Sequence, residues 1–350
     1  MGVPRRRRDG VSMWRRWCRQ APASRAFCRR YLPAPQRHAN LDVRSLVLYE
    51  DNHLIVINKP SGLLCQPDRT KDCDLRSLVL TQHIPTAYLS LVHRLDRPAS
   101  GCVLLAKTSK AAARLSKAFQ GRAVQKLYLC AVQGRPVERA AWLVDSMQAS
   151  PDAQHRSGAA AIHKAAVIPC AVRPLRAAML EMEPLPRSAE DAYVRLHKQQ
   201  LKCRDGAGGE HRSSRQVAAL RYDLVHTAED GAHSLLAVQL HTGRRHQIRA
   251  QLAAHGHAVV GDRRYGKHRH CTLPHLSQLA LHAAMMRLQH PISARGELCV
   301  AAPLPTMWRD ICTADGAVHE LFEEARNAWD EACSDATAMG LHAAGDRTKL

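Results

Sequence analysis

The sequence predicts a mixed α/β (α+β) fold in which strands and helices are joined by many short loops. Short apolar or β-branched runs recur between clusters of Gly, Pro, Asn and Asp, as expected of strands separated by turns. Two other segments combine capping residues with the apolar spacing typical of helices. Hydrophobic residues form 45% of the 350-residue chain, which is enough for a substantial core.

The first ordered elements are expected to be two strands, at residues 46–50 and 54–58. Both are short apolar runs, and the Asp51–Asn52 pair between them is a turn signal. The Lys-Pro-Ser-Gly stretch at 59–62 then ends the second strand. A third strand is expected at 102–106, where the sequence reads CVLLA.

The stretch TSKAAARLSKAFQGR at residues 108–122 predicts a helix, because Thr108 or Ser109 can cap its start and Gly121 can end it. A strand is expected directly after it, at residues 126–134. The inner face of the helix would consist of Leu115, Ala118 and Phe119.

Further along, a strand is expected at 234–240 and a helix at 244–256, with Ile248 and Leu252 facing inward and Gly256 stopping the helix. Residues 279–291 are expected to be a further ordered segment. We expect three parts of the chain: a basic arm at 1–40, a main domain at 41–312 and a C-terminal tail at 313–350. The main domain would carry a flexible insertion near 145–220, where Gly, Ser, Ala and charged residues are frequent.

The formal net charge is +20, which favours a polyanionic partner, most simply nucleic acid, over a merely solvated basic surface. No apolar run approaches the roughly 18 residues that a membrane span requires, so no membrane partner is expected.

Residues 1–37 contain eleven Arg, no Lys and a single acid, Asp9. Trp14, Trp17 and Phe27 add apolar side chains at loosely helical spacing. These features favour an organellar transit peptide, and therefore a mitochondrial location, and there is no long apolar core for a secretory signal. The alternative is a disordered basic arm that grips RNA in the cytoplasm or nucleus.

The twelve Cys residues include no C-x-x-C pair, so we expect reduced thiols rather than a zinc ribbon or a redox dithiol. The stretch KHRHCTLPH lacks a second cluster of ligands nearby, and we predict no metal site there. Its candidate ligands would be His268, His270, Cys271 and His275.

The stretch LVHRLDRPASGCVLLAK places one carboxylate, Asp96, between Arg94 and Arg97 and directly before an apolar run. Taken alone, such an Asp is usually part of a structural ion pair, a Tyr on a strand is usually packing, and an Arg on a helix is usually solvated. Four stretches nevertheless occur together: HRLD at 93–96, QKLYLCAV at 125–132, HTGRRHQIRAQL at 241–252 and GHAVVGDRRYG at 256–266.

The order and the sequences of these stretches resemble the motifs of the RluA-type pseudouridine synthase family over roughly residues 46–306. The departures from the family pattern are Ala99, Gln251 and Ala258, and none of them removes a reacting group. The matching segments are His93–Lys107, Asn58–Leu63, Lys126–Tyr128, Thr242–Leu252, Gly256–Gly266, Leu281–Ala283 and Ala302–Pro305.

The resemblance implies a standalone catalytic domain in which a large, mostly antiparallel mixed sheet, flanked by helices and loops, carries a central RNA-binding cleft. It implies a catalytic Asp96, a Tyr128 that packs against the target base, and an Arg249 that pairs with the catalytic carboxylate. Arg94 would help to fill the gap left by the flipped nucleotide. The implied isomerisation involves no redox change, so we expect no cofactor.

A carboxylate that must stay ionised in a closed pocket needs a cation beside it, and a planar guanidinium can bind it through two hydrogen bonds. Extended backbone at Asp96 would point Arg94 and Arg97 away from it, toward RNA. A flipped base would stack on Tyr128, whose hydroxyl is a candidate for proton transfer. The candidate RNA contacts are Lys59, Arg94, Arg97, Arg244, Arg245, Arg263 and Arg264.

We expect a uridine isomerase whose partner is structured RNA, with organellar ribosomal RNA favoured over transfer RNA. A catalytically idle RNA-binding factor of ribosome assembly, which would bind assembly intermediates, is the second interpretation. A glycoside hydrolase is the third, but it would normally require two carboxylates at a defined separation. Only Asp96 stands in a suitable position, because Asp262 lies in a Gly-bounded turn and has the context of a structural residue.

Overall fold

A computed structural model describes residues 41–70, 72–84, 88–148, 160–180, 183–205, 215–266, 278–308, 320 and 322–327 of the protein. Within these ranges an 11-stranded sheet has the order β1-β2-β4-β10-β5-β9-β8-β6-β7, with β3 paired to β4 and β11 paired to β10. The pairs are antiparallel except for β4 and β10, which run parallel. The expected α/β fold with a large, mostly antiparallel mixed sheet is therefore confirmed.

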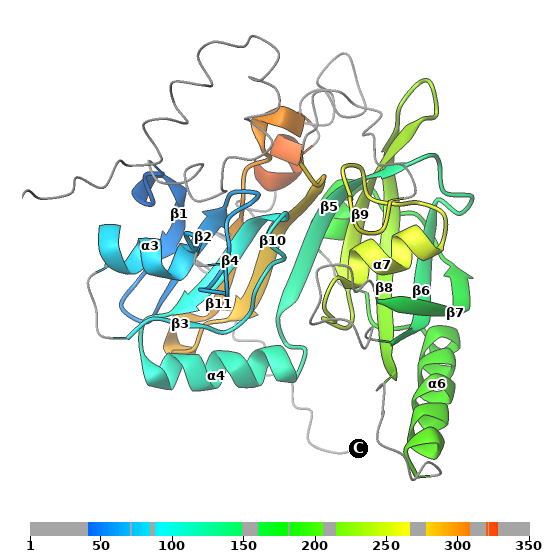
Figure 1. Cartoon of the computed structure of the whole chain (residues 1–350), viewed down its shortest axis with the longest axis horizontal. Coiled ribbons are helices and arrows are strands. Elements are labelled where there is room, and N and C mark those ends of the chain that lie inside the picture. Colours follow the sequence, from blue (N-terminus) through cyan, green and yellow to red (C-terminus); the bar gives the residue numbers. More distant parts are fainter. Residues whose placement is uncertain are drawn as a thin grey trace, which may run out of the picture.

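The strands are β1 (Val47–Glu50), β2 (Leu54–Lys59), β3 (Ser90–Leu91), β4 (Ser100–Ala106), β5 (Gln125–Gln133), β6 (Ala140–Gln148), β7 (Ala161–Pro169), β8 (Arg215–Thr227), β9 (His233–Leu240), β10 (Leu281–Gln289) and β11 (Glu297–Ala301). The helices are α3 (Leu75–Gln82), α4 (Ser109–Gln120), α5 (Leu175–Leu180), α6 (Arg187–Asp205) and α7 (Gln247–Ala254), with 3-10 turns η2 (Arg44–Leu46), η4 (Ser293–Arg295) and η5 (Thr306–Trp308). Figure 1 shows α3 and α4 beside the β1–β4 end of the sheet, and α6 and α7 beside the β8–β6–β7 end.

The β1–β2 hairpin forms where the sequence predicts it, because Asp51 organises the turn. Its Oδ1 atom accepts hydrogen bonds from the backbone N–H groups of His53 at 2.7 Å and Leu54 at 2.9 Å. The strands predicted at 102–106 and 126–134 are also confirmed, as β4 and β5.

Helix α4 begins and ends as the sequence predicts. The side chain of Thr108 caps it by accepting a hydrogen bond from the Ala111 N–H, and Gly121 is its C-cap residue. Leu115 is buried and belongs, with Leu54 of β2, to a hydrophobic cluster on one face of the sheet. Local capping and one apolar face therefore suffice to specify this helix.

The segment near 145–220, predicted as a flexible insertion, has regular secondary structure over most of its described residues. It contributes the end of β6, then β7, α5 and α6, and the start of β8; the three strands extend the sheet beyond β9. β7 lacks an alternating apolar pattern because it is an edge strand whose residues are exposed or half-buried, so its sequence gives a poor strand signal. The parts at 149–159 and 206–214 lie outside the described residues.

Opposite faces of this end of the sheet are covered by α7 and α6. On β8, Ala218 clusters with Ala250 of α7, whereas its neighbours Val217 and Ala219 cluster with Ala192 of α6. This alternation is that of a strand buried on both sides. Helix α7 therefore lies on one face of the β6–β8 region and brings its first turn to the loops described below.

The two ends of the chain are described only in part. The basic arm at 1–40 lies outside the described residues, as do 309–319 and 328–350 of the C-terminal region. Residues 322–327 are helical, and Phe322 and Ala325 are buried in the main hydrophobic core. Among the helices that the structure describes, none is long and apolar enough to cross a membrane.

Candidate active site

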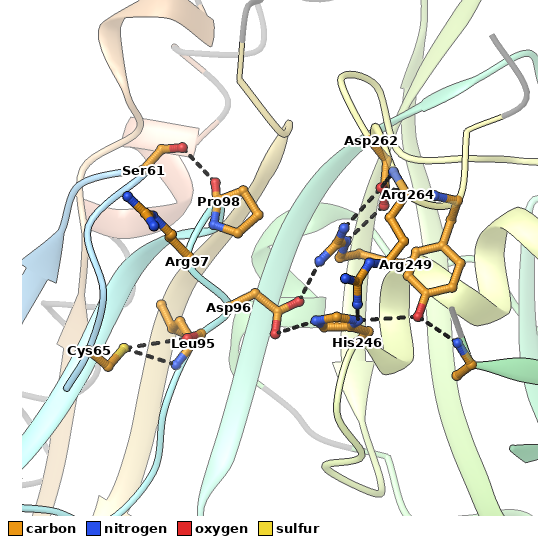
Figure 2. A network of polar contacts seen from close by, with 12 residues as sticks. Ser61, Cys65, Leu95, Asp96, Arg97, Pro98, His246, Arg249, Asp262 and Arg264 are labelled. Atoms are coloured by element: carbon orange, nitrogen blue, oxygen red, sulfur yellow. Dashed lines mark hydrogen bonds and ion pairs between the residues drawn. The ribbon is translucent and has the colours of Figure 1, made fainter. Parts of the chain in front are cut away.

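Asp96 lies on the loop between β3 and β4, and its side chain is 21% exposed. The loop is not extended, because the backbone turns after Asp96 and the Ala99 N–H donates to the Asp96 carbonyl at 3.1 Å. A second loop, at residues 59–65, holds it in place (Figure 2). The hydrogen bonds between the loops are Ser61 Oγ to Pro98 O at 2.6 Å, Gly62 N to Arg97 O at 2.8 Å, Arg97 Nε to Gly62 O at 3.0 Å and Leu95 N to Cys65 Sγ at 3.4 Å.

The two arginines that flank Asp96 have different surroundings. Arg94 is exposed, so it remains a candidate RNA contact. Arg97 instead pairs with Asp72, with 2.7 Å between Arg97 Nη2 and Asp72 Oδ2. The expectation that both arginines face RNA from an extended strand is therefore corrected for Arg97, because a turn directs its guanidinium back toward the protein.

Lys59 was predicted as an RNA contact, and the structure corrects this prediction. The side chain is fully buried, and its Nζ donates to the carbonyl oxygens of Pro60 at 3.0 Å, Leu63 at 2.9 Å and Arg97 at 3.1 Å. Burial lowers the pKa of Lys59 to about 8. Three donors that already bind carbonyl groups leave none for a phosphate, so Lys59 joins the two loops instead.

Arg249 stands in the first turn of α7 and meets Asp96 directly, as predicted. Its Nη1 donates to Asp96 Oδ2 at 2.9 Å. The two-point interaction expected with Asp96 is instead made with another carboxylate, that of Asp262. Arg249 Nε and Nη2 donate to Asp262 Oδ2 at 2.8 Å and Oδ1 at 2.9 Å, respectively. The guanidinium thus links a buried carboxylate to a partly exposed one, as Figure 2 shows.

Electrostatics keeps the buried pair ionised. Burial alone would raise the pKa of Asp262, but the hydrogen bonds and charge of Arg249 lower it, with help from the backbone N–H groups of Arg264 and Tyr265. Burial would likewise lower the pKa of Arg249, whereas its two carboxylate partners raise it above the ordinary range. The side chain of Asp262 has no exposed surface, which agrees with its predicted structural role.

His246 is a site residue that the sequence analysis did not single out. It precedes α7 with φ 57° and ψ 19°, a left-handed conformation that starts the helix at Gln247 rather than at residue 244. Its Nε2 lies 3.6 Å from Asp96 Oδ1, and its Nδ1 lies 3.2 Å from the Tyr265 hydroxyl. The sequence placed His246 within the HTGRRHQIRAQL stretch, but this pattern does not show that the imidazole ring points toward Asp96.

Tyr128 lies in the middle of the sheet, on β5, where it pairs with Ala283 of β10 and Val238 of β9. It is buried, at 7% exposure. Burial raises the pKa of its phenol, and the negative charge of Asp96 raises it further. The phenol therefore stays protonated at neutral pH. It lies close enough to Asp96 for the carboxylate charge to affect its pKa.

Cations surround the site on two further loops. Arg245 and Arg263 are exposed, whereas Arg244 and Arg264 are half-buried. Arg244 Nε donates to the Val217 carbonyl at 3.3 Å. The four predicted phosphate contacts on these loops thus remain candidates, with Arg245 and Arg263 the more accessible pair.

No group of three or more His, Cys, Asp or Glu residues forms a metal-binding cluster within the described part of the chain. The stretch with His268, His270, Cys271 and His275 lies outside it. A cavity of about 530 Å³ beside Arg76 and Tyr88 is lined by the neighbouring loop and not by Asp96. The arrangement at Asp96 is a carboxylate with a fixed direction, an adjacent phenol and a cationic rim, which suits an anionic substrate with an electrophilic carbon.

Comparisons with known proteins agree with this chemistry. The profile described as RNA pseudouridylate synthase matches residues 53–254. The ribosomal large subunit pseudouridine synthase D of Zymomonas mobilis is 27% identical over 278 residues, which cover 75% of this chain and 71% of the relative. The tRNA pseudouridine synthase C of Pectobacterium carotovorum is 28% identical over 321 residues, which cover 86% of this chain and 72% of the relative.

A third relative, the dual-specificity RNA pseudouridine synthase RluA of Escherichia coli K12, is 28% identical over 247 residues, which cover 70% of this chain and 87% of the relative. Among solved structures, the human RNA pseudouridylate synthase domain containing 4 superimposes with a TM-score of 0.51 at 20% identity, covering 81% of this chain and 94% of that one. This structural likeness concerns the fold.

Proposed function

The chain belongs to the RNA pseudouridylate synthase family, and we propose that it converts uridine to pseudouridine in structured RNA with Asp96 as the reacting carboxylate. One observation carries the assignment of Asp96. Its carboxylate is partly exposed, while the guanidinium that holds it, Arg249, is buried and anchored by Asp262. A surface ion pair has no need of such an anchor, whereas a reacting group does.

The reaction requires one well-placed carboxylate and a closed pocket. The bond between N1 of uracil and the anomeric carbon breaks, and a bond between C5 and that carbon forms. C5 loses its proton and N1 ends protonated, so atoms and electrons balance without a redox partner. Asp96 would attack the anomeric carbon or C6 of uracil, or remove the sugar proton that opens a glycal route.

Tyr128 is proposed to support the flipped base. Extruding a base from folded RNA costs a few kcal/mol, which stacking on an aromatic ring and phosphate contacts can offset. Since Tyr128 is set in the sheet beside the Asp96 loop, its ring can present one face or edge to the uracil. Its phenol remains protonated, so it can donate a proton or a hydrogen bond but is poorly suited as a base.

The RNA backbone is proposed to lie along the cationic rim. Arg94, Arg245 and Arg263 are exposed on three separate loops around Asp96. Each phosphate contact contributes to affinity in a salt-dependent way and positions the RNA without reading its sequence. The net charge of +20 adds a longer-range attraction to any polyanion.

The substrate is proposed to be mitochondrial ribosomal RNA, bound within an assembling ribosomal subunit. The named relatives include synthases for ribosomal RNA and for transfer RNA, and the Arg-rich arm at 1–40 has the composition of a transit peptide. A fluorescent reporter fused to residues 1–40 should enter mitochondria. A cytosolic reporter would contradict this location, and a pseudouridine lost only from transfer RNA in cells without the protein would contradict the substrate.

The assignment of Asp96 is tested with RNA that carries tritium at C5 of uridine, because the reaction releases this hydrogen. Asp96→Asn keeps the shape of the side chain but removes its charge. Tritium release should fall by about 10³-fold or more, with RNA affinity unchanged. Asp230→Asn, which alters an exposed carboxylate in the β8–β9 hairpin, serves as the matched control. Substantial turnover by Asp96→Asn would rule out Asp96 as the reacting group.

A further inference from the structure

His246 and Arg249 approach Asp96 from the same side, because both belong to the start of α7. Arg249 Nη1 meets Asp96 Oδ2 at 2.9 Å, and His246 Nε2 faces Asp96 Oδ1 at 3.6 Å. Each carboxylate oxygen is therefore faced by one nitrogen. Figure 2 shows the imidazole and the guanidinium side by side opposite Asp96.

The partners of the other ring nitrogen determine where the imidazole proton sits. Nδ1 of His246 lies 3.2 Å from the Tyr265 hydroxyl and 3.4 Å from Arg264 Nη1. A guanidinium can only donate. The Tyr265 oxygen already accepts the Ala160 N–H at 3.1 Å, which directs its own proton toward Nδ1. Nδ1 is thus the acceptor, and the neutral ring carries its proton on Nε2, which faces Asp96.

We propose that His246 is a positioning residue that donates its Nε2–H to Asp96 Oδ1, and that Tyr265 sets the tautomer that makes this donation feasible. The inference rests on the proposed role of Asp96 as the reacting carboxylate. The distance of 3.6 Å is longer than a hydrogen bond. Catalytic hydrogen bonds are often long in the free enzyme and shorten when substrate closes the site, which is what the inference requires here.

The surroundings of the ring keep it neutral. Burial lowers the pKa of His246 to about 4, against a raising effect of the Asp96 charge. Three cations that face the ring also lower the pKa: Arg249, Arg264 and Arg245. A neutral donor orients the carboxylate, whereas a second cation beside Arg249 would stabilise its charge further and make it a weaker nucleophile or base.

The same contacts connect the active site to the segment near 145–220. Ala160, whose N–H binds the Tyr265 hydroxyl, directly precedes β7. Tyr265 in turn lies edge-on to His246, with ring centroids 5.9 Å apart and planes at 82°. The segment therefore reaches Asp96 through two side chains, so its correct packing is a condition for the tautomer of His246.

Two substitutions of His246 separate donation from packing. Gln places an amide N–H near the position of Nε2, whereas Asn reaches only the position of Nδ1 and suits the left-handed backbone well. His246→Asn should lower the single-turnover rate by about 100-fold, as expected for a misplaced catalytic group, with RNA affinity and melting temperature nearly unchanged. His246→Gln should recover most of this loss. A wild-type rate for His246→Asn, or equal losses for both variants, would overturn the inference.

Tyr265→Phe tests the tautomer. Without the hydroxyl, Nδ1 loses a donor that opposes protonation, so the pKa of His246 should rise toward its ordinary value. The acidic limb of the rate profile should move to higher pH by about one unit. Tyr222→Phe removes another Tyr hydroxyl, which donates to the Glu138 carbonyl at 3.1 Å, and is the matched control. An unchanged profile in Tyr265→Phe would contradict the role of Tyr265.

A readout independent of activity distinguishes this inference from the proposed function. Imidazole ¹⁵N spectra of the free protein should show His246 as the Nε2–H tautomer, still neutral at pH 6. The Nδ1–H tautomer, or titration at the pH of an ordinary histidine, would overturn the inference even if Asp96→Asn abolishes catalysis. Conversely, an active Asp96→Asn variant would overturn the proposed function and leave the tautomer assignment standing.

Discussion

At the scale of single residues, the position of the Asp96 carboxylate depends on a residue that does not touch it. Asp262 binds the guanidinium of Arg249 at two points and leaves only Nη1 for Asp96. Fixing a guanidinium in this way removes rotamers that would otherwise carry Nη1 away from its partner. The direction of Asp96 is thus set by a chain of two ion pairs that begins in a buried turn.

Arg249→Lys should therefore impair catalysis although the charge is retained. An ammonium group cannot bind Asp262 at two points and Asp96 at a third in fixed directions. We expect the single-turnover rate to fall by about 100-fold and RNA affinity to stay the same across salt concentrations. Arg295→Lys, at an exposed arginine that pairs with Asp51, is the control. A retained rate with a shallower salt dependence of binding would instead identify Arg249 as a phosphate ligand.

At the scale of elements, the register of three strands relates the Asp96 loop to Tyr128. Gly101 of β4 lies opposite Ala283 of β10, which in turn lies opposite Tyr128 of β5. The first two backbones approach closely, since a Cβ atom on Gly101 would lie 2.2 Å from the Ala283 carbonyl oxygen. Gly101 also has φ +108°, a conformation that favours glycine. The distance between the Asp96 loop and Tyr128 thus depends on glycine, which has no side chain, at position 101.

Gly101→Ala should force β4 and β10 apart and strain the backbone. We expect the free energy of unfolding to fall by more than about 4 kcal/mol, which chemical denaturation measures. Gly134→Ala is a useful comparison, because Gly134 also has positive φ but a Cβ atom there would meet nothing within 4 Å. If both variants lose the same stability, the strand contact is not the cause.

Asp145 of β6 ties the end of α7 to the β6–β7 hairpin. Its buried carboxylate accepts hydrogen bonds from Gln251 Nε2 at 2.8 Å, His255 Nε2 at 3.0 Å and Ala165 N at 3.1 Å. In Asp145→Asn, one carboxylate oxygen is replaced by an NH₂ group, which cannot accept a hydrogen bond from these donors. A buried donor left without an acceptor costs about 1–3 kcal/mol of stability. The melting temperature should fall, and the rate should fall with it because α7 carries Arg249. Asp191→Asn on α6 should change neither.

At the scale of the whole molecule, buried neutral histidines make stability depend on pH. Burial lowers the pKa of His282 to about 4 and that of His93 to about 3. In the unfolded chain both take up protons near pH 6.5. Between these values the unfolded state binds more protons, so the free energy of unfolding falls as the pH falls from about 6.5 toward 4.

His282→Asn should weaken this dependence. His282 is fully buried, with Nδ1 at 2.9 Å from Ser100 Oγ, and Asn can still accept that hydrogen bond. The variant should be less stable at pH 7, but its loss of stability between pH 6 and 5 should be smaller by about 1.2 kcal/mol. Denaturation of both proteins at several pH values measures the difference. Parallel curves would show that His282 is not a source of the acid sensitivity.

The sequence by itself determined the elements that depend on local signals. The Asp51 turn, the Thr108 cap and the Gly121 stop act within a few residues, so β1, β2 and α4 could be predicted from short stretches. Motif resemblance also identified Asp96 and Arg249 as partners, which the structure confirms. The prediction was wrong for the segment near 145–220, because an exposed edge strand and a helix rich in charged residues leave no clear apolar pattern.

Only the tertiary structure decided how the side chains of the site are shared among partners. Lys59 and Arg249 are both cations in polar stretches. In the structure, however, Lys59 is fully buried, and the two-point interaction of the Arg249 guanidinium is made with Asp262. The position of His246 against Asp96 likewise joins residues 150 positions apart in the chain. Sequence patterns report the few neighbours along the chain, whereas desolvation and competition among several hydrogen-bond partners are settled only when distant segments pack together.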